Sequence, residues 1–306
     1  MQKNSNKRAG RSKRIEKRLA KPIIDPCPPG QKGGAYKPLS EDDINKIYDT
    51  SVNLLENLGI GEVPKRLFED LIAIGAKDSG SGRVLFPKSL IEEAISKAAK
   101  SFTLHGRDEN RSIEVGGNSV YFGTGGAAVQ TLDLDNSKYR PSTLEDLHNF
   151  TKLQDTLANI SWYTRCCVAT DVPDNLDLDV NTAYALIKNT TKPVATSFTL
   201  AEHVEPIVNM LDIAAGGPGE FSKRPFLKAH ISPLISPMRY GEDAVDVVYE
   251  CIKHNIPISC ITAAQAGATA PATLAGFLTQ SLAETLASLI MVHAIKPGFP
   301  MVFSNW

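Results

Sequence analysis

The 306-residue sequence lacks several features that would have placed it in a class at once. It has no run near the ~18 consecutive apolar residues that a membrane-spanning helix needs. Its N-terminus has no apolar core of the kind found in secretory signals. Lysine and arginine (33) balance aspartate and glutamate (34), so the chain has no overall attraction for nucleic acid or an anionic membrane. We therefore expect a cytoplasmic protein with neither a membrane nor nucleic acid as a partner.

Cysteine is scarce, and its placement excludes two further classes. The five cysteines are an odd number, and none is spaced as in a zinc ribbon or a C-x-x-C redox motif. A disulfide framework is disfavoured, a reducing compartment fits best, and we predict no metal site. The cysteines are Cys27, Cys166, Cys167, Cys251 and Cys260.

The first 38 residues differ in composition from the rest. Residues 1–21 contain nine lysines and arginines against Glu16 alone, and no aromatic residues lie between them. A nucleic-acid-binding arm would benefit from such aromatics, so we favour a solvated, disordered tail. Residues 22–38 are rich in proline and glycine and are typical of a linker.

Residues 39–118 predict a helical accessory region. Apolar residues recur at helical spacing in three segments, and Ser40 with Asp43 is placed to cap the first of them. Residues 102–118 alternate loosely and indicate a hairpin or short strands. The three helices are expected at residues 40–58, 63–74 and 87–99.

From residue 119 onward, short apolar strands alternate with amphipathic helices. Such alternation predicts parallel strands joined by right-handed crossovers. Ser142 with Glu145, and Thr199 with Glu202, are spaced as capping boxes for two of the helices. Strands are expected at 119–122, 160–169, 193–198, 225–231, 257–263 and 300–304, and helices at 144–157, 178–188, about 200–215, 241–254 and 273–295.

Two architectures fit this alternation: an open doubly wound sheet and a (β/α)8 barrel. The first strand is followed by Gly123, Thr124, Gly125 and Gly126, about fifteen residues before the next helix, so no glycine turn opens a helix as a dinucleotide site requires. We therefore predict an α/β fold of the TIM (β/α)8 barrel type over residues 119–306. Six units do not close a barrel, so the remaining strands are expected beyond Trp306, and the chain alone is expected to aggregate or to need a complementing piece.

Barrel enzymes carry their sites at the carboxyl ends of the strands. The residues at these positions are hydroxyls, amides and small residues with few charges, which suits a bulky apolar or cofactor face. We assign them shaping and hydrogen bonding and predict no covalent catalyst among them. The predicted pocket residues are Gly123, Thr124, Gly125, Gly126, His230, Ser232, Gln265 and Gly267.

Several residues permit both a functional and a structural interpretation. His230 is as compatible with a core histidine as with an acid, base or ligand. Asp171 could face a cationic substrate, but we favour a role as the cap of the helix beginning near Asp174. Lys228 shares the strand parity of His230 and could form a Schiff base, although an outward-directed side chain is favoured. Some of Tyr121, Phe122, Trp162 and Tyr163 could form an aromatic box for a quaternary ammonium, although packing in the core is favoured.

Several separated motifs carry a family resemblance. They read Tyr-Phe-Gly-Thr-Gly-Gly-Ala-Ala at 121–128, Arg-Pro-Ser-Thr-Leu-Glu-Asp-Leu at 140–147, Ile-Ser-Pro-Leu at 231–234, and Pro-Gly-Phe-Pro at 297–300. Residues 265–276, which begin Gln-Ala-Gly-Ala-Thr, belong to the same set. In this order the motifs resemble the trimethylamine methyltransferase family over residues 39–306.

The resemblance implies a barrel that passes a methyl group from a small N-methylated amine to the Co(I) of a corrinoid. It implies that the corrinoid is presented by a separate, cognate protein and is not permanently bound here. Trimethylamine and a quaternary amine such as glycine betaine both stay open, because the pyrrolysine of some members would lie beyond Trp306. A homo-oligomer is compatible with the sequence. The alternatives are a truncated, non-catalytic remnant that binds amines or a corrinoid protein, and a Schiff-base aldolase using Lys228.

Overall fold

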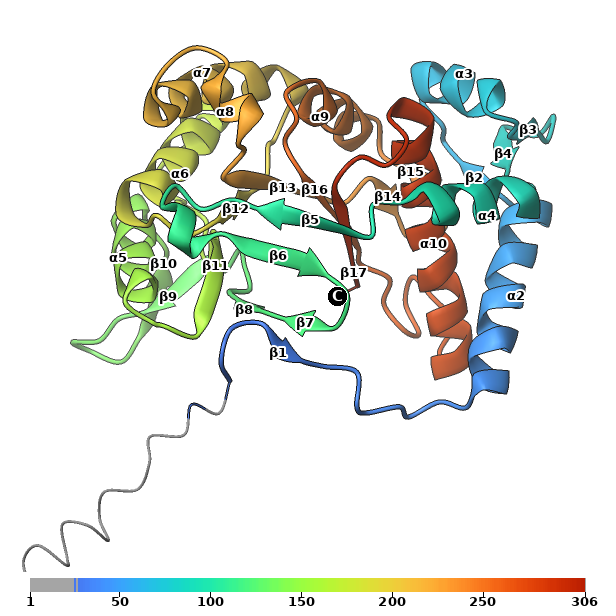
Figure 1. The fold of residues 1–306 in the computed structure, drawn as a ribbon, viewed down its shortest axis with the longest axis horizontal. Coiled ribbons are helices and arrows are strands. Elements are labelled where there is room, and N and C mark those ends of the chain that lie inside the picture. The colour runs from blue at the N-terminus through green and yellow to red at the C-terminus, as the bar shows by residue number, and fades with distance from the viewer. Residues whose placement is uncertain (1–24, 26, 306) are drawn as a thin grey trace, which may run out of the picture.

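A sheet of six parallel strands forms the centre of the protein in the computed structural model, which describes residues 25 and 27–305 (Figure 1). Each strand pairs with the next one of the sheet along the chain, and helices connect them. The strands are β8 (Phe122–Gly123), β11 (Ile160–Thr164), β12 (Val194–Thr196), β13 (Leu227–Ile231), β16 (Ile258–Thr262) and β17 (Met301–Asn305). The helices are α5 (Leu144–Asp155), α6 (Asn175–Asn189), α7 (Val204–Ala215), the short α8 (Glu220–Lys223), α9 (Glu242–Lys253) and α10 (Leu274–Ile295).

The parallel α/β architecture and the order of its six units confirm the prediction at that level. The sheet curls as half of a barrel, with β8 and β17 as its edges in the described part of the chain, and the helices lie around its outer side (Figure 1). A complete barrel stays a prediction. The expected first strand was misplaced, because Ser119 and Val120 form β7 (Ser119–Val120), which pairs antiparallel with β1 (Gln31–Lys32). Only Phe122 and Gly123 join the main sheet.

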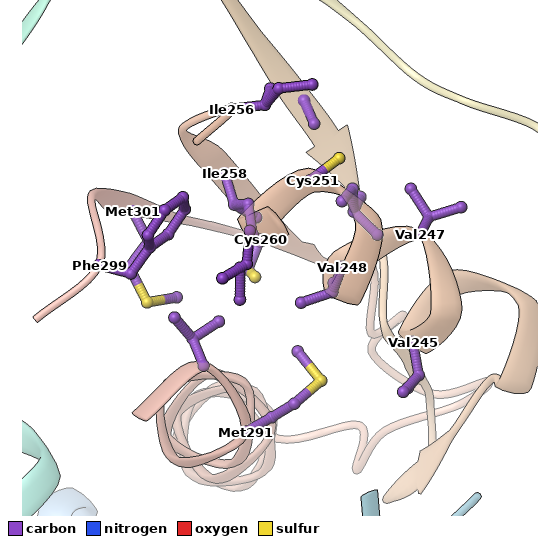
Figure 2. Close-up of a cluster of buried hydrophobic side chains, with 14 of the residues drawn as sticks. Val245, Val247, Val248, Cys251, Ile256, Ile258, Cys260, Met291, Phe299 and Met301 are labelled. Carbon is purple, nitrogen blue, oxygen red and sulfur yellow. The ribbon is translucent and has the colours of Figure 1, made fainter. Parts of the chain in front are cut away.

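The core between the sheet and its helices is built by strands that are buried on both faces (Figure 2). All five residues of β16 are buried, as expected for a strand covered on both sides. Val248 and Cys251 of α9 and Met291 of α10 meet Cys260 of β16 in this layer. Burial raises the pKa of Cys260 to about 12, so its thiol stays protonated and serves as a packing group.

Helix α10 is apolar on nearly every side, which is the pattern of a helix surrounded by protein. By length and composition alone it could cross a membrane, but 67% of its apolar window is buried inside the structure. It packs against the sheet on one side and against α2 (Glu41–Asn57) on another, where the Ser51 hydroxyl donates to the Thr279 carbonyl. The helix therefore joins the accessory region to the half barrel.

The accessory region contains the three expected helices and the expected hairpin. Ser40 caps α2 by accepting from the Asp43 backbone N–H, as predicted. A second sheet, which was not predicted, runs β14–β15–β2–β4–β3 and so includes a hairpin that follows β13. The elements are α3 (Lys65–Ala73), α4 (Lys88–Lys97), β5 (Ser101–Leu104), β6 (Ile113–Gly116), β2 (Ile60–Gly61), β3 (Lys77–Asp78), β4 (Arg83–Leu85), β14 (Leu234–Ile235) and β15 (Arg239–Tyr240). The predicted basic tail, residues 1–21, lies outside the described residues.

Both predicted capping boxes of the half barrel were wrong in detail. At α5 the box is shifted by one residue, because Thr143 and Asp146 exchange the two hydrogen bonds. Ser142 instead donates to the carbonyls of Ala128 and Val168. At α7 no side chain caps the helix, and Thr199 is bonded to Asp179 of α6.

Candidate functional site

A cavity of about 650 Å³ lies within the curl of the sheet and opens at the carboxyl ends of its strands. This is the end at which barrel enzymes carry their sites, and the volume is within the usual range for small-molecule pockets. We call the open end the mouth and the opposite end the floor. Its lining combines small, hydroxyl and cationic side chains, among them Thr124, Gly125, Gly126, Trp162, Thr164, Arg165, Ser197, Phe198, Lys228, His230, Ser232, Asp243, Ser259 and Val302.

The structure brings together five of the eight predicted pocket residues: Thr124, Gly125, Gly126, His230 and Ser232 all line this cavity. Gly123 lies directly beside it, against a lining residue.

The other two predicted residues, Gln265 and Gly267, are exposed and lie outside the lining. The connection from β16 to α10 folds on itself, because the Gln265 carbonyl accepts from three backbone N–H groups within five residues. Gly267 adopts a positive φ of 80° in this turn. These two residues therefore shape a loop rather than the cavity wall.

Gly123 is required by the packing of Trp162. A Cβ at position 123 would lie 2.0 Å from the indole Cε2, a distance that no side chain tolerates. A Cβ at Gly126 would lie 2.5 Å from the Arg165 carbonyl oxygen. These glycines thus let the first loop lie close against β11, which keeps the indole in the cavity wall.

Lys228 lies inside the cavity, so the expectation of an outward-directed side chain was wrong. The residue is only 5% exposed, and its Nζ lies 4.0 Å from the centre of the Trp162 ring. Among the described residues no carboxylate forms an ion pair with it. Burial lowers the pKa of Lys228 to about 8, because water is removed from its charge. The lysine is therefore mostly cationic at neutral pH but easily deprotonated.

His230 is two residues further along β13, on the same face. Its ring meets Trp162 edge to face at 5.9 Å, and its Nδ1 lies 3.4 Å from the Thr164 hydroxyl. Burial, together with the charges of Lys228 and Arg165, lowers the pKa of His230 to about 3. The imidazole is consequently neutral near pH 7 and suited to hydrogen bonding, while a role as a cationic acid is disfavoured.

Arg165 was missed in the sequence. It follows Thr164 directly, so strand alternation would direct it away from the cavity, but β11 ends at Thr164 and alternation no longer applies. Burial lowers the pKa of Arg165, and the charge of Asp179 partly compensates. Asp179 itself is buried and also bound by Thr199 and His203. No signal in the sequence marks this arrangement, since it depends on where the strand stops.

Of the four aromatic candidates, only Trp162 lines the cavity. Tyr163 points to the opposite face of β11, where its hydroxyl lies 3.2 Å from the Cys166 sulfur. Phe122 is 43% exposed, and the Tyr121 ring packs against Gly30. Of the four predicted rings, therefore, one lines the described cavity, where Phe198 and His230 add two rings that were not in the predicted set.

Comparisons with known proteins agree with the motifs. The sequence profile of the trimethylamine methyltransferase (MTTB) family matches residues 5–306. The chain belongs to this family. It is 29% identical over 277 residues to a glycine betaine methyltransferase of Desulfitobacterium hafniense strain Y51, covering 90% of this chain and 57% of that protein.

Two further relatives carry the family name. The trimethylamine methyltransferase MttB of D. hafniense strain DSM 10664 / DCB-2 is 26% identical over 267 residues, or 87% of this chain and 53% of that protein. MttB of Methanosarcina barkeri strain Fusaro is 26% identical over 262 residues, or 84% and 53%. The chain thus spans a little over half the length of these relatives.

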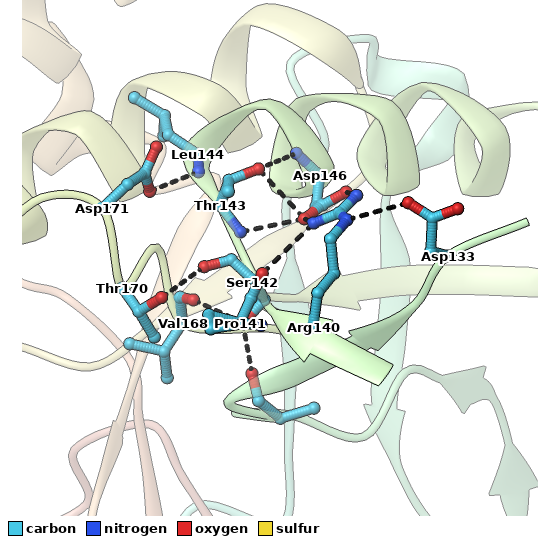
Figure 3. A network of polar contacts seen from close by, with 11 residues as sticks. Asp133, Arg140, Pro141, Ser142, Thr143, Leu144, Asp146, Val168, Thr170 and Asp171 are labelled. Carbon is cyan, nitrogen blue, oxygen red and sulfur yellow. Dashed lines mark hydrogen bonds and ion pairs between the residues drawn. The ribbon is translucent and has the colours of Figure 1, made fainter. Parts of the chain in front are cut away.

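The motif at 140–147, which carries much of the family resemblance, forms a network of polar contacts at the start of α5 and does not line the cavity (Figure 3). The Arg140 guanidinium donates to both carboxylate oxygens of Asp146, at 2.6 and 2.8 Å, and to the carboxylate of Asp133. Asp146 accepts in turn from the backbone N–H of Thr143. These bonds lower the pKa of Asp146 to about 2, chiefly through the guanidinium. The motif therefore fixes the start of α5 against the loop that precedes it.

The same network determines the role of Asp171. Its carboxylate accepts from the Leu144 backbone N–H, 2.8 Å away, at the first turn of α5 (Figure 3). Asp174 caps α6 by itself. Asp171 therefore caps a helix, as predicted, but the helix is α5 and not α6. The residue does not line the cavity.

The chemistry open to this site follows from what lines it. The described residues contain no cluster of three or more histidine, cysteine or acidic side chains able to hold a metal ion. The single lining carboxylate named above, Asp243, is exposed at the start of α9. The lining thus combines neutral hydrogen-bonding groups and aromatic rings with the two cations Lys228 and Arg165 and one exposed carboxylate.

Proposed function

We propose that the chain forms the amine-binding part of a methyltransferase that transfers a methyl group from a small methylated amine to a corrinoid carried by a separate protein. The proposal rests on family membership and on one observation: a cavity of about 650 Å³ opens where barrel enzymes bind substrates. The named relatives act on trimethylamine or glycine betaine, and both classes of donor are included here.

The residues of the cavity suit such a transfer. Moving a methyl group from an ammonium nitrogen requires alignment and exclusion of water, and it requires no base. The corrinoid, when presented by its protein, supplies the strong nucleophile Co(I). At the mouth, the small residues Gly125, Gly126 and Ser232 leave room for a cofactor beside the larger side chains of Arg165 and Phe198.

The test is methyl transfer to reduced cobalamin, followed by the change from the Co(I) to the methyl-cobalt absorption spectrum. We expect the protein to form methylcobalamin from at least one methylated amine. The absence of transfer from trimethylamine, glycine betaine and longer betaines alike, with a folded protein and fully reduced cobalamin, would contradict the proposal and favour a binding role without catalysis.

A second candidate activity is favoured by Lys228, whose buried and readily deprotonated amine is suited to form an imine with a carbonyl compound. Borohydride reduction in the presence of a small aldehyde or keto acid would trap such a species on the protein. Mass spectrometry should then find the adduct on Lys228, and its absence in the Lys228→Met variant is the required control.

A further inference from the structure

The distribution of charge in the cavity is unbalanced. Among the described residues, two cations, Lys228 and Arg165, line it, together with a single carboxylate, the exposed Asp243. Arg165 has a buried countercharge nearby in Asp179. Lys228 has no countercharge among the described residues, although it is buried, with only 5% of its surface exposed. Burial of an unpaired charge lowers the stability of the folded protein. Lys228 is therefore suited to bind an anionic ligand.

The strand register places this cation at the floor of the cavity. Lys228 pairs with Ala195, and Ala195 pairs with Thr164, so these residues form one row across three strands. Trp162 lies two residues before Thr164, about 7 Å further from the mouth. Because the Lys228 Nζ lies over the Trp162 ring, it points down to the floor and not up to the solvent.

This arrangement restricts the ligand. The indole face, which could otherwise hold a trimethylammonium group, is already covered by the Lys228 ammonium at 4.0 Å. A ligand whose only charge is positive would be repelled by Lys228 and Arg165 together. A ligand that also carries an anionic group would instead neutralise the floor.

We propose that Lys228 binds the carboxylate of the methyl donor, and that the donor is therefore a zwitterion in which a methylated ammonium is joined to a carboxylate. The assignment rests on the proposed function and deepens it. The carboxylate lies at the floor, and the methylammonium group faces the mouth beside Gly125 and Ser232, where a partner protein can approach.

The experiment compares glycine betaine with choline, which has the same ammonium group but a hydroxyl in place of the carboxylate. Isothermal titration calorimetry at pH 7 is run on the wild type and on Lys228→Met. The wild type is expected to bind glycine betaine about tenfold or more tightly than choline. Lys228→Met should lose most of that preference, with weaker binding of the betaine and unchanged or tighter binding of choline.

Two variants keep the test independent of folding. Lys228→Arg retains the charge and should retain a preference for the betaine. Lys192→Met removes a second lysine that is buried in the described part of the chain. Its ammonium donates to two backbone carbonyls outside the cavity, and its loss should leave the preference intact. Circular dichroism establishes that each variant is folded before it is titrated.

Several results would overturn the assignment. One is a betaine preference that survives in folded Lys228→Met. Another is a wild-type protein that binds choline or trimethylamine with the same affinity as glycine betaine. A third is a wild-type protein that binds neither glycine betaine nor choline. Tighter, Lys228-dependent binding of inorganic phosphate would make the ligand a phosphate and equally contradict a carboxylate. In each of these cases, methyl transfer from another amine would still support the proposed function. If no amine donated a methyl group, the proposed function would be contradicted as well.

Discussion

Two lysines are buried in the described part of the chain, and only one of them, Lys228, lines the cavity. Lys192 precedes β12, at the amino end, and its ammonium donates to the carbonyls of Gln154 and Leu157 at 2.9 and 2.7 Å. Lys228 is inside the cavity, and no described residue accepts a hydrogen bond from its ammonium in this way. A buried lysine thus donates to two carbonyls where it lies outside the cavity, and has no acceptor among the described residues where it lines the cavity.

The sharpest test of this contrast is Lys192→Met. The substitution leaves two carbonyl oxygens at the end of α5 without their charged donor, and we expect the free energy of unfolding to fall by about 4 kcal/mol. Urea denaturation at pH 7 measures the change. A loss below about 1 kcal/mol would show that these bonds contribute little, and the contrast with Lys228 would then disappear.

Lys228→Met is expected to act in the opposite direction. A pKa lowered from 10.5 to about 8 corresponds to a destabilisation by the buried charge of about 3 kcal/mol, and methionine removes the charge while filling a similar space. The same urea titration should show a gain in stability of up to this size. A clear loss would mean that the ammonium has a stabilising partner that its surroundings do not reveal.

The pH dependence of stability distinguishes an effect of the Lys228 charge from an effect of side-chain packing. Between about pH 8 and 10.5 the unfolded chain still holds the Lys228 proton that the folded protein has released, so the stability of the wild type rises with pH in this window. The advantage of Lys228→Met should therefore be constant below pH 8 and shrink toward pH 10.5. An advantage that is independent of pH would indicate a packing effect.

A smaller effect is expected at the wall beside Lys228. Gly123→Ala places a Cβ against the indole of Trp162 and should destabilise the protein by about 2 kcal/mol, as overpacking does. Gly125→Ala is the matched control, because a Cβ there meets nothing within 4 Å. Thermal unfolding of both variants should show a loss only for Gly123→Ala, and equal melting temperatures would contradict the close contact.

The smallest effect is expected at Asp171. Asp171→Asn weakens the acceptor for the Leu144 backbone N–H, and the loss should be below about 1 kcal/mol. Because Asp171 lies outside the cavity lining, affinity for a methylated amine should not change. A selective loss of affinity in a fully stable variant would restore the interpretation of Asp171 as a substrate contact.

The long helices and the order of the parallel strands were predictable from the sequence because each extends over several periods of its apolar pattern. Helix α10 and strand β16 are examples, and their predicted bounds agree within one residue with those observed. The cavity residues of β13 were predictable for the same reason, since alternation places Lys228 and His230 on one face. The preferred direction of Lys228 was still wrong, because periodicity does not say which face is the inside.

The second sheet and Arg165 were not predictable in this way. Strands such as β2 and β15 contain two residues each, which is too short for any period to show. Arg165 enters the cavity only because β11 stops one residue earlier, and Gln265 leaves it because its loop closes on itself. Each of these depends on tertiary contacts that local sequence does not encode.

The pairing of Gly61 in β2 with Arg239 in β15 links the accessory region to a segment that is far along the chain. During synthesis the accessory region emerges early, but its sheet lacks a neighbour until about 180 further residues have followed, and such long-range pairing is slow to form. The hairpin that completes this sheet continues directly from β13, the strand that bears Lys228 and His230. We therefore expect the accessory region and the cavity strand to unfold together as one cooperative unit.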